Sequence, residues 1–90
     1  MPCYLVETYL ARDRVEERAA CEQRASTAAK ELTQEGTGVR FDRSIHVPED
    51  ELSFYVFEAA SAGDAGHAAR RTGLDPIRVV EVASSGKENA

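Results

Sequence analysis

The sequence has little of what most binding and targeting signals require. Its 90 residues include no tryptophan, two histidines and two cysteines, Cys3 and Cys21, which do not form a CxxC pair. We therefore expect free thiols in a reducing cytoplasm rather than a disulfide. The N-terminus lacks the basic, apolar and small-residue regions of a signal peptide, and no apolar run approaches the about 20 residues that span a bilayer. These absences predict a cytoplasmic protein without a membrane partner.

Positive charge is also scarce. The chain has 11 Lys and Arg against 16 Asp and Glu, which gives a formal net charge of -5. An acidic chain repels phosphate backbones, and the basic residues are scattered among acids rather than gathered in a patch. The composition therefore argues against a nucleic-acid partner. No glycine-rich phosphate loop follows the first apolar segment, so no organic cofactor is expected.

The length is that of one small domain. We expect the domain to cover residues 1–83 and the polar segment 84–90 to be a loose tail. A chain this short buries only about 60–65% of its unfolded surface. A second subunit that adds buried area would therefore matter for its stability.

Helical patterns occupy two segments. Residues 11–36 are rich in Ala, Glu and Arg, with Asp13 and Glu16 as a capping box and Gly36 at the end. The apolar residues close to one face of this helix are Val15, Ala19, Ala25, Ala29 and Leu32. A second helix is predicted from Ser61, a capping residue with Asp64 three positions later, to Gly73.

Strand patterns occupy the remaining segments. Residues 3–10 are short and apolar, and residues 39–47 alternate between apolar and polar side chains. Pro48 then begins a four-residue turn that ends at Glu51. Residues 52–59 are apolar on both faces, as in a central strand, and "IRVVEVA" is the last strand.

The order strand, helix, strand, strand, helix, strand predicts an α+β fold, the ferredoxin-like βαββαβ sandwich. Right-handed crossovers place both helices on one face of a four-stranded antiparallel sheet. The first and third strands are central and apolar on both faces, so the face without helices needs a cover. We expect a homodimer of the αβ-barrel type, in which two such faces pack across a two-fold axis.

The turn length sets the register of the hairpin. It pairs Val47 with Leu52, and the alternation then divides the two strands between two faces. One face holds Asp42, Ser44, His46, Ser53, Tyr55 and Phe57. The other, which we expect under the helices, holds Phe41, Ile45, Val47, Leu52, Phe54 and Val56. A slip by one residue would reverse the faces.

His46 is the leading candidate for chemistry. On the non-helical face it would be a metal ligand or a general base, with the turn acids Glu49, Asp50 and Glu51 close in sequence. Imidazole suits nickel, zinc or copper. The alternative is a solvent-facing or interface histidine beside a solvated turn, because one histidine lacks a multi-ligand pattern. His67 is expected to be an exposed helical residue.

Glutamates inside strands are unusual because the residue is depleted there. We expect the first and third strands to be parallel neighbours, with Glu7 and Glu58 near one another towards their C-terminal ends. Two adjacent carboxylates would raise one pKa or share a cation. The alternative is separate pairing, for example Glu58 with Arg43.

Three segments, "PCYLVETYL", "SIHVPEDELSFYVFEAASAGDAGHAARRTGL" and "RVVEV", resemble the small DUF4242 family that is common in actinobacteria. The resemblance covers about residues 2 to 82, and its most specific part is the run from "VPEDE" through "FEA". At least one branch of this largely uncharacterised family is described as nickel-binding, with a dimeric ferredoxin-like fold. The resemblance implies that nickel or another divalent transition metal is bound.

Three functions follow from these observations, and whether the protein is an enzyme stays open. The first is a small metal-binding protein, with ligands drawn from His46, Glu49, Asp50, Glu51, Glu7 and Glu58. The second is a cofactor-free enzyme of the dimeric αβ-barrel type, with a pocket on the sheet lined by Ser44, Tyr55 and Phe57 beside His46. The third is a structural interaction module.

Overall fold

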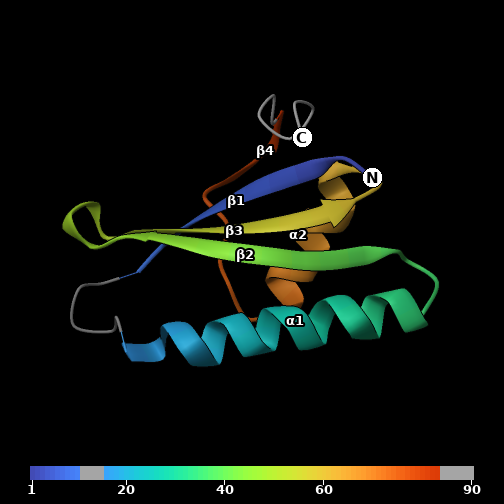
Figure 1. The fold of residues 1–90 in the computed structure, drawn as a ribbon, viewed down its shortest axis with the longest axis horizontal. Helices are drawn as coiled ribbons and strands as arrows, with labels where there is room; N and C mark the ends of the chain where they lie inside the picture. The colour runs from blue at the N-terminus through green and yellow to red at the C-terminus, as the bar shows by residue number, and fades with distance from the viewer. Residues whose placement is uncertain (11–15, 84–90) are drawn as a thin grey trace, which may run out of the picture.

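The computed structural model describes residues 1–10 and 16–83. Within them the chain forms four strands, two α-helices and one 3-10 turn (Figure 1). These elements are β1 (Cys3–Tyr9), α1 (Arg18–Gln34), β2 (Val39–Val47), η2 (Pro48–Asp50), β3 (Leu52–Ala59), α2 (Ala62–Arg71) and β4 (Arg78–Val82). The strand order is β2-β3-β1-β4, and every neighbouring pair is antiparallel. The predicted ferredoxin-like α+β fold is confirmed.

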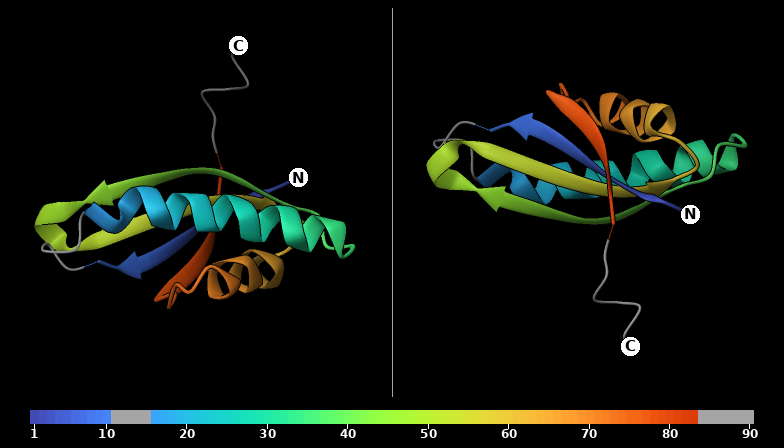
Figure 2. Two further views of the ribbon diagram at one scale, coloured as in Figure 1. Left: turned by 90° about the horizontal axis from the view of Figure 1, so that it is seen from below. Right: turned by 90° about the horizontal axis from the view of Figure 1, so that it is seen from above.

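The two helices lie on the same side of the sheet (Figure 2). α1 runs along β2 at one edge, and α2 lies behind β3 and β1 (Figure 1). The molecule therefore has two layers, and it measures 35 × 33 × 21 Å. The other broad face of the sheet is not covered by a helix in the described residues. Among these residues, no helix is long and apolar enough to cross a membrane.

Small side chains let both helices approach the sheet closely. α1 buries Cys21, Ala25, Ala28, Ala29 and Leu32, and α2 buries Ala65, Gly66, Ala68 and Ala69. Ala19, which the helical pattern placed on the apolar face, is exposed. The predicted capping residue Asp13 and the apolar Val15 lie outside the described residues, as does the segment 84–90.

The start of α2 and the ends of both helices lie at the capping and glycine residues that the sequence predicted. Ser61 caps α2 by accepting a hydrogen bond from the Asp64 amide at 3.2 Å. Gly36 and Gly73 follow the two helices with φ of +104° and +95°, the left-handed region that glycine adopts without a steric penalty.

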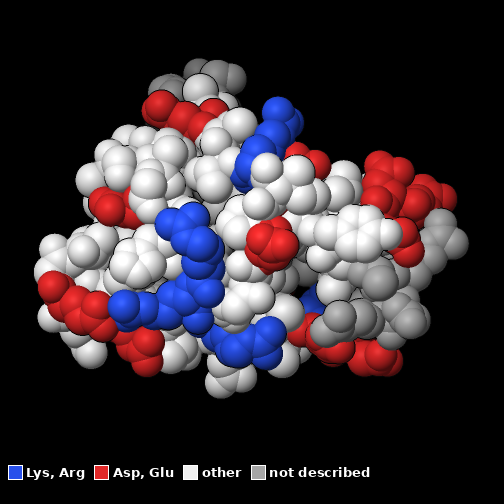
Figure 3. Space-filling model, turned by 180° about the vertical axis from the view of Figure 1, so that it is seen from behind, with Lys and Arg blue, Asp and Glu red and all other residues white. Residues whose placement is uncertain are grey.

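An ion pair joins the helices near their C-terminal ends. Arg71 of α2 donates to both carboxylate oxygens of Glu35, at 2.7 and 3.1 Å, and lies 4.0 Å from Glu31. The hydrogen bonds from Arg71 lower the pKa of Glu35. Figure 3 shows the helical side of the molecule, where Lys and Arg side chains form a band beside acidic side chains.

The faces of the hairpin are the reverse of those predicted. Val47 pairs with Leu52 as expected, and the register holds up to Arg43, which pairs with Val56. A β-bulge then inserts one residue between Phe41 and Arg43, so Phe41 rather than Asp42 lies opposite Phe57. The core on the helical side contains Tyr4, Val6, Val39, Tyr55, Phe57 and Ala59.

The bulge explains why the prediction failed. Without it, Val39 and Phe41 would share a face with Ile45 and Val47, and that face would be the natural core. With the extra residue, Val39 and Phe41 lie under the helices while Ile45 lies on the open face, where it is 41% exposed. The sequence of β3 does not indicate which of its faces lies under the helices, because the strand is apolar on both faces.

The predicted parallel pairing of β1 and β3 is also wrong. The two strands are antiparallel, with Cys3 opposite Glu58 and Glu7 opposite Phe54. Since β3 is antiparallel to both of its neighbours, β1 and β2 are the strands that run in the same direction. This is the arrangement expected when a helix connects two strands that have a third strand between them.

Candidate functional site

His46 lies under the first half of α1 rather than on the open face. Its Nδ1 is 2.8 Å from Ser53 Oγ, and its Nε2 is 3.1 Å from Ser44 Oγ. The same Nε2 lies 3.7 Å from Glu22 Oε2 of α1. The Ser44 hydroxyl also donates to that Glu22 oxygen. These four side chains form one connected polar cluster between the hairpin and α1.

The alternation of the hairpin builds three members of this cluster. Ser44 and His46 are two positions apart on β2 and therefore point to the same side. Ser53 lies directly opposite His46, and Tyr55 lies opposite Ser44 with its ring edge-on to the imidazole. Glu22 comes from α1, next to the buried Cys21. The site thus joins residues that are distant in the sequence.

The cluster passes from the surface into the core. The side chain of Glu22 is 44% exposed, that of His46 is 10% exposed, and Ser53 is fully buried. Burial lowers the pKa of His46, Arg18 lowers it further, and the nearby carboxylate of Glu22 opposes both effects. The imidazole is therefore neutral at neutral pH. Because the Ser53 hydroxyl can donate or accept, it is compatible with either tautomer.

A second polar chain lies beside the cluster. Arg24 of α1 donates to Cys21 Sγ at 3.2 Å and to the backbone oxygen of Thr72 at 3.2 Å. Burial raises the pKa of Tyr55, and the neighbouring Cys21 raises it further. Cys21 is a free cysteine, buried in the core.

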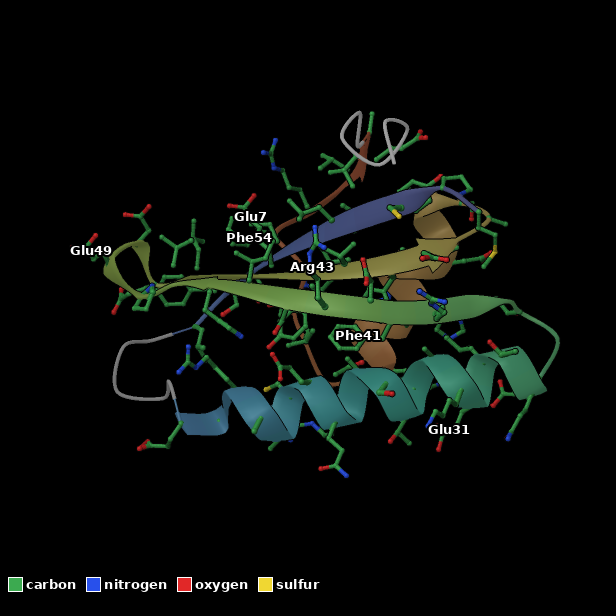
Figure 4. The ribbon with its side chains drawn as sticks, in the orientation of Figure 1. Glu7, Glu31, Phe41, Arg43, Glu49 and Phe54 are labelled. Carbon is green, nitrogen blue, oxygen red and sulfur yellow. The ribbon has the colours of Figure 1, made fainter. Side chains whose placement is uncertain are left out.

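The acidic turn does not join His46. Glu49 and Asp50 lie in the exposed η2 turn, and Figure 4 shows Glu49 at the tip of the hairpin. Glu51 closes the turn with φ of +54°, and its carboxylate accepts a hydrogen bond from Tyr9 Oη. Among the described residues, no three His, Cys, Asp or Glu side chains are grouped so that they could hold a metal ion.

The two strand glutamates are separated. Glu58 lies opposite Cys3, four residues along β1 from Glu7, a distance of about 13 Å along the strand. Glu7 pairs with Arg78 at 2.8 Å, and Glu58 pairs with Arg40 at 3.3 Å. The expected carboxylate pair is therefore wrong. Separate pairing is what the structure contains, with Arg40 in the place expected for Arg43.

Ser44, Tyr55 and Phe57, which were expected to line a pocket, lie on the face of the sheet that packs against the helices. Tyr55 and Phe57 are 1% and 0% exposed, and the Phe41 ring packs against both at 6.3 and 5.5 Å. Ser44 is half-buried beside His46. These residues therefore face the helices and not the open sheet. His67 is exposed on α2, as predicted.

Two residues of the cluster, Glu22 and Ser53, were not predicted as site residues from the sequence. Glu22 follows the buried Cys21 and lies three positions before the buried Ala25, at the border of the apolar face of α1. Ser53 is a single polar residue in the apolar segment 52–57, opposite the only histidine of the hairpin. Both positions carry a signal, since a polar residue in or beside a buried face needs a hydrogen-bond partner.

The fold and the cluster together define a small ferredoxin-like α+β domain with a polar site between its hairpin and its first helix. No family model matches the chain, and no curated protein matches it. The chain is similar to the crystal structure of SCO4226 from Streptomyces coelicolor A3(2), with a TM-score of 0.76 and 15% sequence identity. The match covers 92% of this chain and 98% of the other. At this identity the similarity establishes the fold.

Proposed function

We propose that the protein binds a divalent transition metal ion, such as nickel, through His46 and Glu22. The observation that carries the proposal is the position of the imidazole: Ser53 holds Nδ1 at 2.8 Å, and Nε2 faces Glu22 Oε2 at 3.7 Å. Two donor atoms bound at about 2.1 Å to one tetrahedral ion are roughly 3.4 Å apart. The two side chains therefore need only a small movement to share an ion.

The chemistry of the donors supports the same proposal. Imidazole and carboxylate together suit nickel, zinc and copper. Histidine ligands of metals have their second ring nitrogen held by a hydrogen bond, the role that Ser53 would have here. Glu22 is exposed enough for water to complete the coordination. In this proposal Glu22 takes the place of the turn acids and of Glu7 and Glu58.

Isothermal titration with nickel, zinc and cobalt tests the proposal. The wild type should bind at least one of these ions in the micromolar range, and His46→Gln and Glu22→Gln should each abolish or strongly weaken the binding. His67→Gln and Glu81→Gln are matched controls, because both replace exposed residues outside the cluster. Absence of binding, or equal loss in the controls, would contradict a site at His46 and Glu22.

We further propose that the protein is a cytoplasmic homodimer of the DUF4242 family, joined through the open faces of two sheets. The resemblance described above supports the family, and the cytoplasmic location is carried over from the sequence analysis. The open face supports the dimer, because it carries the apolar residues Leu5, Ile45, Val47, Leu52, Phe54, Val56, Val80 and Val82. Figure 4 shows Phe54 and Arg43 over this face. The broad dimensions of 35 × 33 Å leave room for the about 800 Å² per partner of a standard interface.

A second candidate function is a cofactor-free hydrolytic enzyme. Ser44 Oγ lies 3.1 Å from His46 Nε2, and Ser53 orients the other nitrogen. If the Ser44 hydroxyl turns its proton from Glu22 to the imidazole, the three side chains have the arrangement of a nucleophile, a base and an orienting group. A fluorophosphonate probe should then label Ser44, and both Ser44→Ala and His46→Gln should prevent labelling, as read by intact mass. An unlabelled wild type would remove this candidate and leave the metal proposal untouched.

A further inference from the structure

A groove separate from the His46 cluster lies between the second half of α1 and the start of β2. Its volume is about 740 Å³, within the roughly 300–1,000 Å³ of pockets for small molecules. Its apolar lining includes Met1, Ala29, Val39 and Phe41. Figure 4 shows Phe41 in the space between β2 and α1. From α1 the groove is lined by the small residues Ser26 and Ala29, and by Lys30, Thr33 and Gln34.

The polar side chains that line the groove differ in whether they already have hydrogen-bond or ion-pair partners. Thr33 Oγ1 donates to the Val39 oxygen at 2.8 Å and accepts from the Val39 amide at 3.1 Å, so both of its functions are used. Arg40 is paired with Glu58 at 3.3 Å. Lys30 is exposed and forms no hydrogen bond or ion pair with another of the described residues. The exposed Asp42 of β2 also lines the groove, so the position for an anion is beside Lys30 on α1, the lining cation without a partner among the described residues.

The strand edge beside the groove does not favour a peptide. β2 is an edge strand, so its outer side is open in the described sheet. The bulge between Phe41 and Arg43 interrupts its regular pairing edge, and Arg40, Asp42 and Arg43 add charges. Bulges and charged residues are the features that prevent an added strand from pairing with an edge. A small molecule fits the groove better than an extended chain.

We propose that this groove binds a small amphipathic anion, a carboxylate with an aliphatic or aromatic body. The body lies against Ala29, Val39 and Phe41, and the carboxylate is paired with Lys30. None of Glu22, Ser44 and His46 lines the groove, so this site is independent of the proposed metal site. It is also on the opposite side of β2 from the open face proposed for the dimer.

Titration with octanoate, followed by amide chemical shifts and calorimetry, tests the proposal. Saturable binding should shift the amides of Ala29, Gly38 and Val39, and octylammonium should bind more weakly because its charge is repelled by Lys30. Lys30→Glu should weaken octanoate binding by about fivefold or more, the upper range for one exposed ion pair. Arg70→Glu changes the net charge equally but lies on α2 outside the groove, so its effect should stay within about twofold.

A steric variant gives a second, independent test. Gly38 lines the groove without a left-handed φ, and a Cβ there would meet only Met1 Sδ, at 3.9 Å. Gly38→Val should therefore fold normally, as judged by circular dichroism, and lose octanoate binding. The proposal is overturned by no saturable binding, by equal effects of Lys30→Glu and Arg70→Glu, or by shifts confined to open-face residues such as Leu5 and Ile45.

Discussion

At the scale of single residues, the notable feature is a polar cluster inside a sheet face that is mostly apolar. Burying an imidazole and a hydroxyl costs free energy unless they are hydrogen-bonded, and His46 and Ser53 meet this requirement through each other. No buried side-chain nitrogen or oxygen of the described residues lacks a partner. The cluster therefore holds one fixed arrangement of side chains rather than a loosely packed polar pocket.

Ser53→Ala should show how much the hydrogen bond between Ser53 and His46 contributes to the free energy of unfolding. The hydroxyl is fully buried, so its loss leaves His46 Nδ1 without a partner and should lower the free energy of unfolding by about 1–2 kcal/mol. Urea denaturation followed by circular dichroism measures the change. In a double-mutant cycle with His46→Leu, the coupling energy should be at least about 0.5 kcal/mol. Strictly additive effects would mean that the two side chains do not depend on each other.

At the scale of elements, the bulge in β2 decides which residues are buried. One extra residue, Asp42, lets Val39 and Phe41 pack under α1 while Ser44 and His46 also point toward that helix. The bulge therefore builds the apolar groove at one end of β2 and the polar cluster at the other. Both proposed binding sites depend on this one irregularity.

Deletion of Asp42 should be far more damaging than its replacement. Asp42 is exposed, so Asp42→Ala should change stability by no more than about 0.5 kcal/mol. Removing the residue restores regular pairing and turns Val39 and Phe41 away from the core, which should cost at least about 3 kcal/mol. Thermal unfolding compares the two variants. A deletion variant as stable as Asp42→Ala would show that the bulge does not set the faces.

The ion pair between the helices should give stability a dependence on pH. Because Arg71 lowers the pKa of Glu35 in the folded state, the contribution is present above the ordinary value of 4.5 and is lost as the pH falls through the folded pKa. The advantage of the wild type over Glu35→Gln should therefore shrink on acidification. Urea denaturation between neutral pH and about pH 3, which is below the ordinary pKa of a glutamate, measures the change.

Glu31→Gln is the matched control for this measurement. Glu31 is on the same helix and lies 4.0 Å from Arg71, but Glu35 accepts two hydrogen bonds. The pH-dependent difference should be smaller for Glu31→Gln. An advantage that grows at low pH would be inconsistent with a lowered pKa of Glu35.

At the scale of the whole molecule, the sheet has one covered and one open broad face. The helical side holds the core of Tyr4, Val6, Tyr55 and Phe57. The open side carries apolar rows bordered by the ion pairs Arg40–Glu58 and Glu7–Arg78. An apolar centre with a polar border is typical of a subunit interface.

Ile45→Glu should separate the proposed dimer into monomers. Ile45 is 41% exposed on the open face, so a charge there can reach water in the monomer but would be buried in the interface. Ile77→Glu is the matched control, since Ile77 is 56% exposed and lies outside the open face, beside Tyr9 and Leu74. Sedimentation velocity should give a dimer for the wild type and the control. A wild type that is monomeric at micromolar concentration contradicts the proposal.

The sequence by itself determined the element order, the ferredoxin-like α+β fold and the four-residue turn, but not the relative direction of β1 and β3. Glycine, proline and serine at the ends of elements, together with the periods of the apolar residues, act locally and can be read locally. The register next to the turn also followed, because a turn of known length fixes which residues pair, as in Val47 with Leu52.

Only the tertiary structure decided which face of the hairpin lies under the helices, and hence what His46 contacts. A bulge adds one residue without a sequence signal as strong as that of a turn, and β3 fits either orientation because both of its faces are apolar. Glu22 meets His46 only because α1 packs along β2, a contact between segments more than twenty residues apart. Local patterns fix elements, whereas a site made of several elements depends on how they pack.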